Sequence, residues 1–393
     1  MISRSLLLLR RISRQLWVRV ALISLFSLLS LAVAPLLTPI LPQDWADRFG
    51  RDAVLPVLNI LASGMLAVTT FSLNVMVSAY RTASGMATPR VYRLLLEDTV
   101  TQSVLATFTG GFIYSLSAII LFRAQIYPAG AAFIVFVMTV FVVALIVVSM
   151  LRWIDHLSDL GSMDHTLRLI ETQTRESLEA RRDMPNLGGR CRSEDAPEGR
   201  AIPAGASGFV RFVDMMRLQD LAAEAGAEMH LTRLPGEFVL RGRPLAVATG
   251  ADEAFCKQAA ALIEVGDVRS FEQDPSFGLT LLAETAQRAL SPGVNDPGTA
   301  IEVLGRIERL LWETLPVDAE APQDRAKFDR ITLPPVTAEA LLKASFPPIA
   351  RCAADAPEVM EWMDKALCAL ADHPNPAMPE AAEAMRKALI DQA

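Results

Sequence analysis

The sequence predicts a multi-pass α-helical membrane domain with four transmembrane helices, followed by a cytosolic α+β domain with a helical C-terminal region. Four apolar segments lie near the N-terminus, arginines gather in alternate loops, and short β patterns alternate with amphipathic helices further on. The expected organisation is a transmembrane domain (1–151), a stalk helix (152–182), a linker (183–207), an α+β domain (208–314) and a C-terminal linker with helices (315–393).

The four expected spans each approach the ~20 residues needed to cross a hydrocarbon core of ~30 Å. They cover residues 16–37, 53–79, 101–122 and 129–151. The first 19 residues carry five arginines and no acidic residue, so we expect a short amphipathic helix on the inner leaflet. Prolines, and no small-residue cleavage site, follow the first apolar run, which favours a retained span over a signal peptide.

Charge sets the expected orientation. Arginines concentrate in the N-terminal arm, in the loop after the second span and after the fourth span, whereas the other side is richer in aspartate. This bias predicts a bacterial inner-membrane protein with both termini in the cytoplasm. Residues 1–182 hold 16 Lys and Arg against 11 Asp and Glu, and the remainder holds 21 against 33. An acidic cytosolic half argues against a nucleic-acid partner and against that half lying flat on anionic lipid.

Two spans carry polar stripes. At ~100° per residue, one face of the second span and one face of the third collect small polar side chains. The members are Asn59, Ser63, Thr70 and Asn74 on the second span, and Ser103, Thr107, Tyr114 and Ser117 on the third. The stripes either pack helices together or line a water-filled path. In both cases a homo-oligomer is expected, since one four-helix unit has little room to hide both stripes.

No charged residue lies well inside the apolar cores, which counts against an ion-coupled transporter more than against a passive pore. The fourth span is expected to continue as a stalk helix to about Arg182, with a break at Gly161. His156 and Asp159 share a helix face there, but the pattern favours a solvated acidic stalk, and we expect no metal site. The four cysteines are widely scattered, and no cofactor is expected.

The soluble half begins with a predicted strand at 208–213 and a helix between Asp214 as N-cap and Gly226. Three strands within 227–249, a helix, and a strand at 267–272 follow. Helices near 276–290 and 297–314, and three more near 337–352, 356–372 and 378–391, complete the pattern.

The corner between the first two of these helices is a candidate ligand or subunit contact, formed by Asn295, Asp296 and Thr299. The alternative is a tight helix–helix corner, because Asp296 followed by Pro297 is an N-cap with proline at the first helical position. His230, among apolar neighbours in a predicted strand, is interpreted as a core residue. Nucleophile-elbow, Walker, zinc-protease and dinucleotide motifs are absent, so we expect no enzyme.

Two stretches, 71–116 and 274–300, resemble the bacterial predicted-membrane-protein family known as domain of unknown function 2254. The family's pattern is matched by Phe71-Ser72, Thr88-Pro89-Arg90, Asp98, Gln102 and the segment ALSPGVNDPGTA at 289–300. Threonine stands at 88 where the family has serine. The resemblance implies the membrane topology and no established activity. It directs attention to the loop bracketed by Arg90, Asp98 and Gln102, where topology places Arg90 to meet the stalk or the Asn-Asp-Pro corner.

Two functions remain open on the sequence. One is an oligomeric channel or pore-like protein gated by its cytosolic domain. The other is a membrane-anchored sensor or scaffold whose α+β domain binds a ligand or a partner protein. The direction in which Asn59, Thr70 and Asn74 face distinguishes them, because burial against another helix of the same subunit excludes the first.

Overall fold

The computed structural model describes residues 16–37, 51–96, 98–126, 131–192, 197–316 and 326–390. The predicted amphipathic helix before residue 16 lies outside them. The chain divides into two compact units. The first comprises Met1–Ser84 and Tyr92–His165, and the second comprises Gly85–Val91 and Thr166–Ala393. The short loop 85–91 therefore belongs with the C-terminal part of the chain, although both of its neighbours in sequence belong to the first unit.

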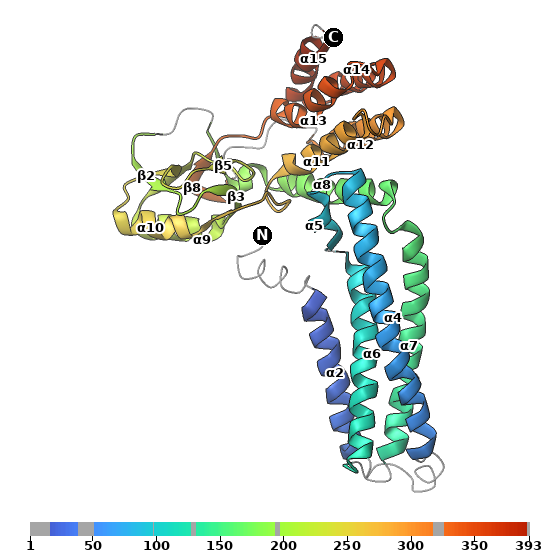
Figure 1. Ribbon diagram of the computed structural model, residues 1–393. Coiled ribbons are helices and arrows are strands. Elements are labelled where there is room, and N and C mark those ends of the chain that lie inside the picture. Colours follow the sequence, from blue (N-terminus) through green and yellow to red (C-terminus); the bar gives the residue numbers. More distant parts are fainter. Residues whose placement is uncertain are drawn as a thin grey trace. The chain divides into compact units, whose positions relative to one another are not determined.

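The described residues of the first unit form helices and their connections (Figure 1). They are α2 (Leu16–Leu37), α4 (Arg51–Met86), α5 (Val91–Leu96), α6 (Thr99–Arg123) and α7 (Ala131–Asp159). Three stretches within the described residues are long and apolar enough to cross a membrane: Val54–Met86, Thr99–Arg123 and Ala131–Leu157. A shorter apolar helix, Trp17–Val33, lies within α2. The expected first span at 16–37, and with it the count of four, stays a prediction, as does the cytoplasmic placement of the termini.

The core of the first unit is centred on α6, the most buried of the three long apolar helices. Tyr114 is fully buried, and its hydroxyl is 3.1 Å from both the Val135 carbonyl and the Thr139 hydroxyl. A side chain at Gly110 would overlap Ile23 of α2, so this glycine lets the two helices approach closely. Packing on three sides explains why α6 alternates large apolar and very small residues.

The second unit contains two small sheets. A five-stranded sheet has the order β1-β8-β4-β6-β2, in which β8 pairs in parallel with β1 and β4 and the other neighbours are antiparallel. A three-stranded antiparallel sheet has the order β5-β3-β7. The strands are β1 (Gly189–Cys191), β2 (Arg200–Pro203), β3 (Gly208–Val213), β4 (Glu228–Leu231), β5 (Phe238–Val239), β6 (Pro244–Thr249), β7 (Ile263–Gly266) and β8 (Phe328–Leu333).

The sheet corrects the expected division of the soluble half. The segment 183–207 was expected to be a linker, yet it supplies β1 and β2, and the segment near 315–335 supplies β8. These strands are three to six residues long and carry charged residues, so the sequence alone makes them look like loop. Pairing with β4 and β6 makes them strands. The expected strand at 267–272 is absent, because Arg269 turns back to bond Asp274 at 2.7 Å.

Helices cover the sheet and form a separate bundle. Near the sheet are α9 (Met215–Ala225) and α10 (Glu253–Ala261), and Asp214 and the left-handed Gly226 cap α9 as predicted. The bundle consists of α11 (Pro275–Ala289), α12 (Pro297–Thr314), α13 (Ala338–Cys352), α14 (Pro357–Ala371) and α15 (Ala377–Ile390). In the bundle, α11 packs on α12 and α13, and α14 packs on α12 and α15.

The predicted stalk is broken where expected. Helix α7 ends at Asp159 and α8 (Met163–Asp183) begins after Gly161, whose φ of 85° is left-handed. An ideal side chain atom on Gly161 would lie 3.3 Å from Ala79 of α4. Both the backbone angle and the close approach therefore favour glycine here.

Candidate functional site

The polar stripe of α4 faces away from its own bundle. Asn59, Ser63, Thr70 and Asn74 are all exposed, whereas the opposite side of α4 buries Val54, Leu58 and Met65. Within the described part of the chain, neither asparagine side chain makes a hydrogen bond. The hydroxyls of Ser63 and Thr70 donate 2.9 Å bonds to backbone carbonyls one turn earlier in α4. The two asparagine amides thus need water or a partner outside the described residues.

The stripe of α6 behaves differently, because most of it is satisfied within the unit. Thr107 donates to the Ser103 carbonyl at 2.9 Å, and Ser103 donates to the carbonyl of Thr99 at 2.7 Å. Arg19 of α2 reaches the Ser103 hydroxyl at 2.8 Å. Tyr114 is bonded to α7, and Ser117 is half-buried. The two stripes that the sequence treated as similar therefore differ in surroundings.

The segment Thr88-Pro89-Arg90 is held by one carboxylate of the second unit. Glu284 of α11 accepts a 2.8 Å hydrogen bond from the Thr88 hydroxyl and pairs with the Arg90 guanidinium. Thr88 is buried, and the Arg90 side chain is 62% exposed. Arg90 was expected to meet the stalk or the Asn-Asp-Pro corner. Its partner, Glu284, belongs to α11, the helix that leads into that corner.

Asp98 and Gln102 act locally at the start of α6. Asp98 is the N-cap, accepting from the Val100 amide at 3.0 Å and from the hydroxyl of Thr101. Its second oxygen is 2.6 Å from Nε2 of His156 on α7. Burial by itself would raise the pKa of Asp98, but the bonds from His156 and Thr101 outweigh it and lower the pKa to about 2. Gln102 donates to the Leu96 carbonyl at 2.7 Å. These bonds fix α6 to the end of α7.

The corner at Asn295-Asp296 has the geometry of a cap. Asp296 accepts from the amide of Thr299 at 3.0 Å and from its hydroxyl at 2.6 Å, which lowers the pKa of Asp296. Asn295 adopts φ 51°, and the Asp296 amide donates to the Ala289 carbonyl at 2.8 Å. The side chains of Asp296 and Thr299 satisfy each other, as a tight helix–helix corner requires.

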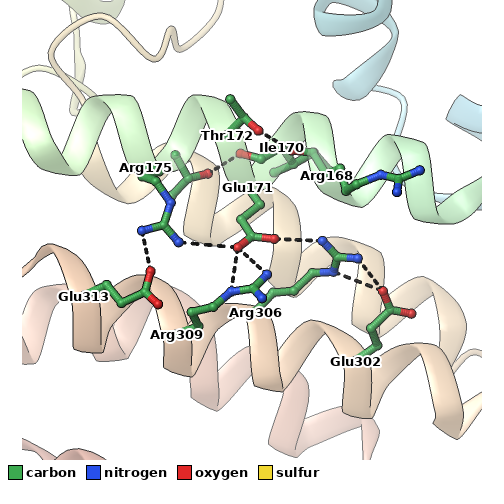
Figure 2. Close-up of polar contacts among 10 residues, drawn as sticks. Arg168, Ile170, Glu171, Thr172, Arg175, Glu302, Arg306, Arg309 and Glu313 are labelled. Carbon is green, nitrogen blue, oxygen red and sulfur yellow. Dashed lines mark hydrogen bonds and ion pairs between the residues drawn. The ribbon is translucent and has the colours of Figure 1, made fainter.

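A buried carboxylate that sequence reasoning missed joins α8 to α12. Glu171 is 7% exposed and accepts from Arg306 at 2.7 Å and from Arg309 at 2.9 Å and 2.5 Å (Figure 2). Arg175, one turn along α8, lies 3.6 Å from the same carboxylate. Two glutamates of α12 close the ends of the array: Glu302 pairs with Arg306 and Glu313 with Arg175, both at 2.6 Å.

A signal for this array was present in the sequence. Glu171 with Arg175, and Glu302 with Arg306, are opposite charges four residues apart on amphipathic helices. That spacing ordinarily indicates solvated pairs within one helix. Pairing between the two helices depends on how α8 packs against α12, which spacing does not determine.

Comparison with known proteins finds relatives of unknown activity. Residues 13–369 match the model of a family described as "Predicted membrane protein (DUF2254)". Uncharacterized proteins of Mycobacterium bovis and Mycobacterium tuberculosis are each 30% identical over 294 residues, covering 69% of this chain and 54% of theirs. The chain thus spans about half the length of the curated relatives that it matches. No solved structure matches the chain.

Proposed function

Because the chain belongs to the DUF2254 family of predicted membrane proteins, we propose that it acts as a homo-oligomeric, channel-like protein whose α4 helices face a shared centre. The observation that carries the proposal is the direction of the α4 stripe. Asn59 and Asn74 point out of their own bundle, and neither amide is hydrogen-bonded within the described chain.

The hydrocarbon core makes this arrangement costly for a single copy. It offers no hydrogen bonds, so an amide that faces lipid loses the bonds it would make in water. A second copy, or water enclosed by several copies, restores them. The fifteen helical rises from Asn59 to Asn74 extend about 22 Å along the helix axis, most of the ~30 Å core. The stripe is therefore long enough to line most of a path.

The second unit is connected to the spans at two places through which it could control the conformation of α4. The loop 85–91 directly follows α4, and Glu284 of α11 holds it through Thr88 and Arg90. The other connection is α8, fixed to α12 through Glu171. A change in the second unit can thus act on the end of the striped helix through the chain itself.

Single cysteines at Asn59, Ser63, Thr70 and Asn74, in a cysteine-free background in sealed vesicles, test the proposal. We expect all four to react with a membrane-impermeant thiol reagent and to cross-link neighbouring copies. Matched cysteines at Val57 and Phe71, exposed on another face of α4, should stay unreactive because lipid covers them. If all four stripe positions are protected and the detergent-solubilised protein has a monomeric mass, the proposal is wrong.

A second candidate function is the membrane-anchored sensor or scaffold, in which α4 only packs against another copy. The hydroxyls of Ser63 and Thr70 favour it, because they are already satisfied by the backbone of α4 and need no water. Cross-linking without reactivity toward the impermeant reagent would identify this function instead.

Reversing the charge of Arg90 tests the link between the loop and the second unit. In Arg90→Glu the new carboxylate faces Glu284, so we expect amide hydrogen exchange in residues 85–91 to accelerate about two- to fivefold. That range corresponds to ~0.4–1 kcal/mol, as for a largely exposed ion pair. The double variant Arg90→Glu with Glu284→Arg should restore slow exchange. Unchanged exchange in the single variant would show that the pair does not hold the loop.

A further inference from the structure

Two buried polar groups on one turn of α8 have no hydrogen-bond partner among the residues that the structure describes. They are Oγ of Ser177, a residue only 8% exposed, and Nη2 of Arg181. Four residues apart, these side chains share one face of the helix. Other hydroxyls of α8, on Thr172 and Thr174, bond to carbonyls one turn back, at 2.8 Å and 2.6 Å. Ser177 does not, so its hydroxyl remains available to another group.

No carboxylate among the described residues balances the charge of Arg181. Burial lowers the pKa of Arg181 to about 10, so the guanidinium is still protonated at neutral pH. Among the described residues, the titratable group whose charge acts on it is Cys191, and no carboxylate does so. A buried cation is ordinarily compensated by an anion, because desolvation without a counter-charge is costly.

A second arginine directly follows β1. Cys191 ends β1, and the next residue, Arg192, carries a charge that acts on His230 of β4. Burial, followed by the charge of Arg192, lowers the pKa of His230. His230 is 5% exposed, and its Nδ1 lies 2.9 Å from the Thr332 hydroxyl of β8. A positive charge therefore acts at this end of the sheet.

We propose that Ser177 and Arg181 form part of a binding site for a small anion that presents a carboxylate or phosphate group. The planar guanidinium offers parallel donors to two oxygens of such a group, and the serine hydroxyl donates to one of them. The site lies wholly in the second unit. This binding site goes beyond the proposed function, because anion binding here does not depend on whether the spans form a channel.

Thermal unfolding of the detergent-solubilised full chain tests the site, with sodium phosphate, sodium acetate and sodium chloride compared at equal ionic strength. We expect phosphate or acetate to raise the Tm in a saturable manner and chloride to have little effect. In Arg181→Met, the anions should no longer raise the Tm. Because this variant lacks the buried charge, its Tm without added anion should be higher than that of the wild type. Ser177→Ala should weaken the apparent affinity about tenfold, as for one lost hydrogen bond.

The matched control is Arg182→Met, because Arg182 is the next residue, is more exposed and is paired with Asp183 at 3.2 Å. Arg182→Met should show the same rise in Tm with phosphate or acetate as the wild type. An anionic lipid headgroup offers the same phosphate chemistry, so a parallel arm compares micelles with and without phosphatidylglycerol. Stabilisation by that lipid alone, lost in Arg181→Met, would assign the site to a headgroup. Equal responses of the wild type to all three salts, with no effect of the lipid, would overturn the site without any variant.

Discussion

Replacing Glu171 with alanine is expected to lower the free energy of unfolding of the second unit by about 3 kcal/mol. Removing one member of a buried ionic array leaves its partners charged and desolvated. The Arg306 side chain is only 11% exposed and loses one of two carboxylates, keeping Glu302. Arg309 is 51% exposed and can be hydrated instead, which keeps the expected loss at the lower end of the usual range.

Urea unfolding of the solubilised full chain, with amide hydrogen exchange followed in α8 and α12, measures the loss. The matched control is Glu313→Gln, which removes a 48% exposed partner of Arg175 and should cost under about 1 kcal/mol. The double variant Glu171→Met with Arg306→Met should recover most of the stability, because apolar side chains of similar volume replace a buried pair at little cost. Equal effects of Glu171→Ala and Glu313→Gln would mean that the array is effectively solvated.

Replacing Gly278 with alanine is expected to destabilise the second unit by about 1–3 kcal/mol. Gly278 lies in α11, and an added Cβ would overlap the side chain of Thr174 on α8. Thr174 is completely buried, and its hydroxyl bonds the Ile170 carbonyl, so it has little freedom to move away. The two helices must separate or shift.

A second helical glycine provides the control. Gly305 in α12 has no atom within 4 Å of the position its Cβ would take, so Gly305→Ala should raise stability by about 0.5–1 kcal/mol through helix propensity. In Gly278→Ala with Thr174→Gly, the overlap is removed, and part of the lost stability should return. Urea unfolding measures all three variants. A neutral effect of Gly278→Ala would show that the α8–α11 contact is looser than the structure indicates.

Local signals were sufficient for most of the helices. The caps at Asp214 and Asp296, the left-handed Gly226 and the stalk break at Gly161 all depend on residues within a few positions of one another. Such interactions are written directly in the sequence, since capping and backbone angles need no distant partner. The same is true of the long apolar helices, which length and hydropathy reveal.

The small strands could not be found in this way. Residues 189–191 and 328–333 become strands because each pairs with a segment far away in the chain, and three to six residues carry too little periodicity of their own. The family resemblance pointed to Arg90 but not to its partner. Nothing about Glu284 distinguishes it from other exposed-looking glutamates until α11 is placed beside loop 85–91.

The sequence by itself determined that this is a membrane protein with long apolar helices and a helix-rich C-terminal half, because hydropathy and capping are local properties. It also identified both polar stripes, since helical periodicity assigns residues to a face. Only the tertiary structure decided that Tyr114 of the α6 stripe is buried against α7 while Asn59 and Asn74 of α4 face outward. It also showed that Glu171 gathers its arginines from another helix. Periodicity defines a face, but only packing decides what that face meets.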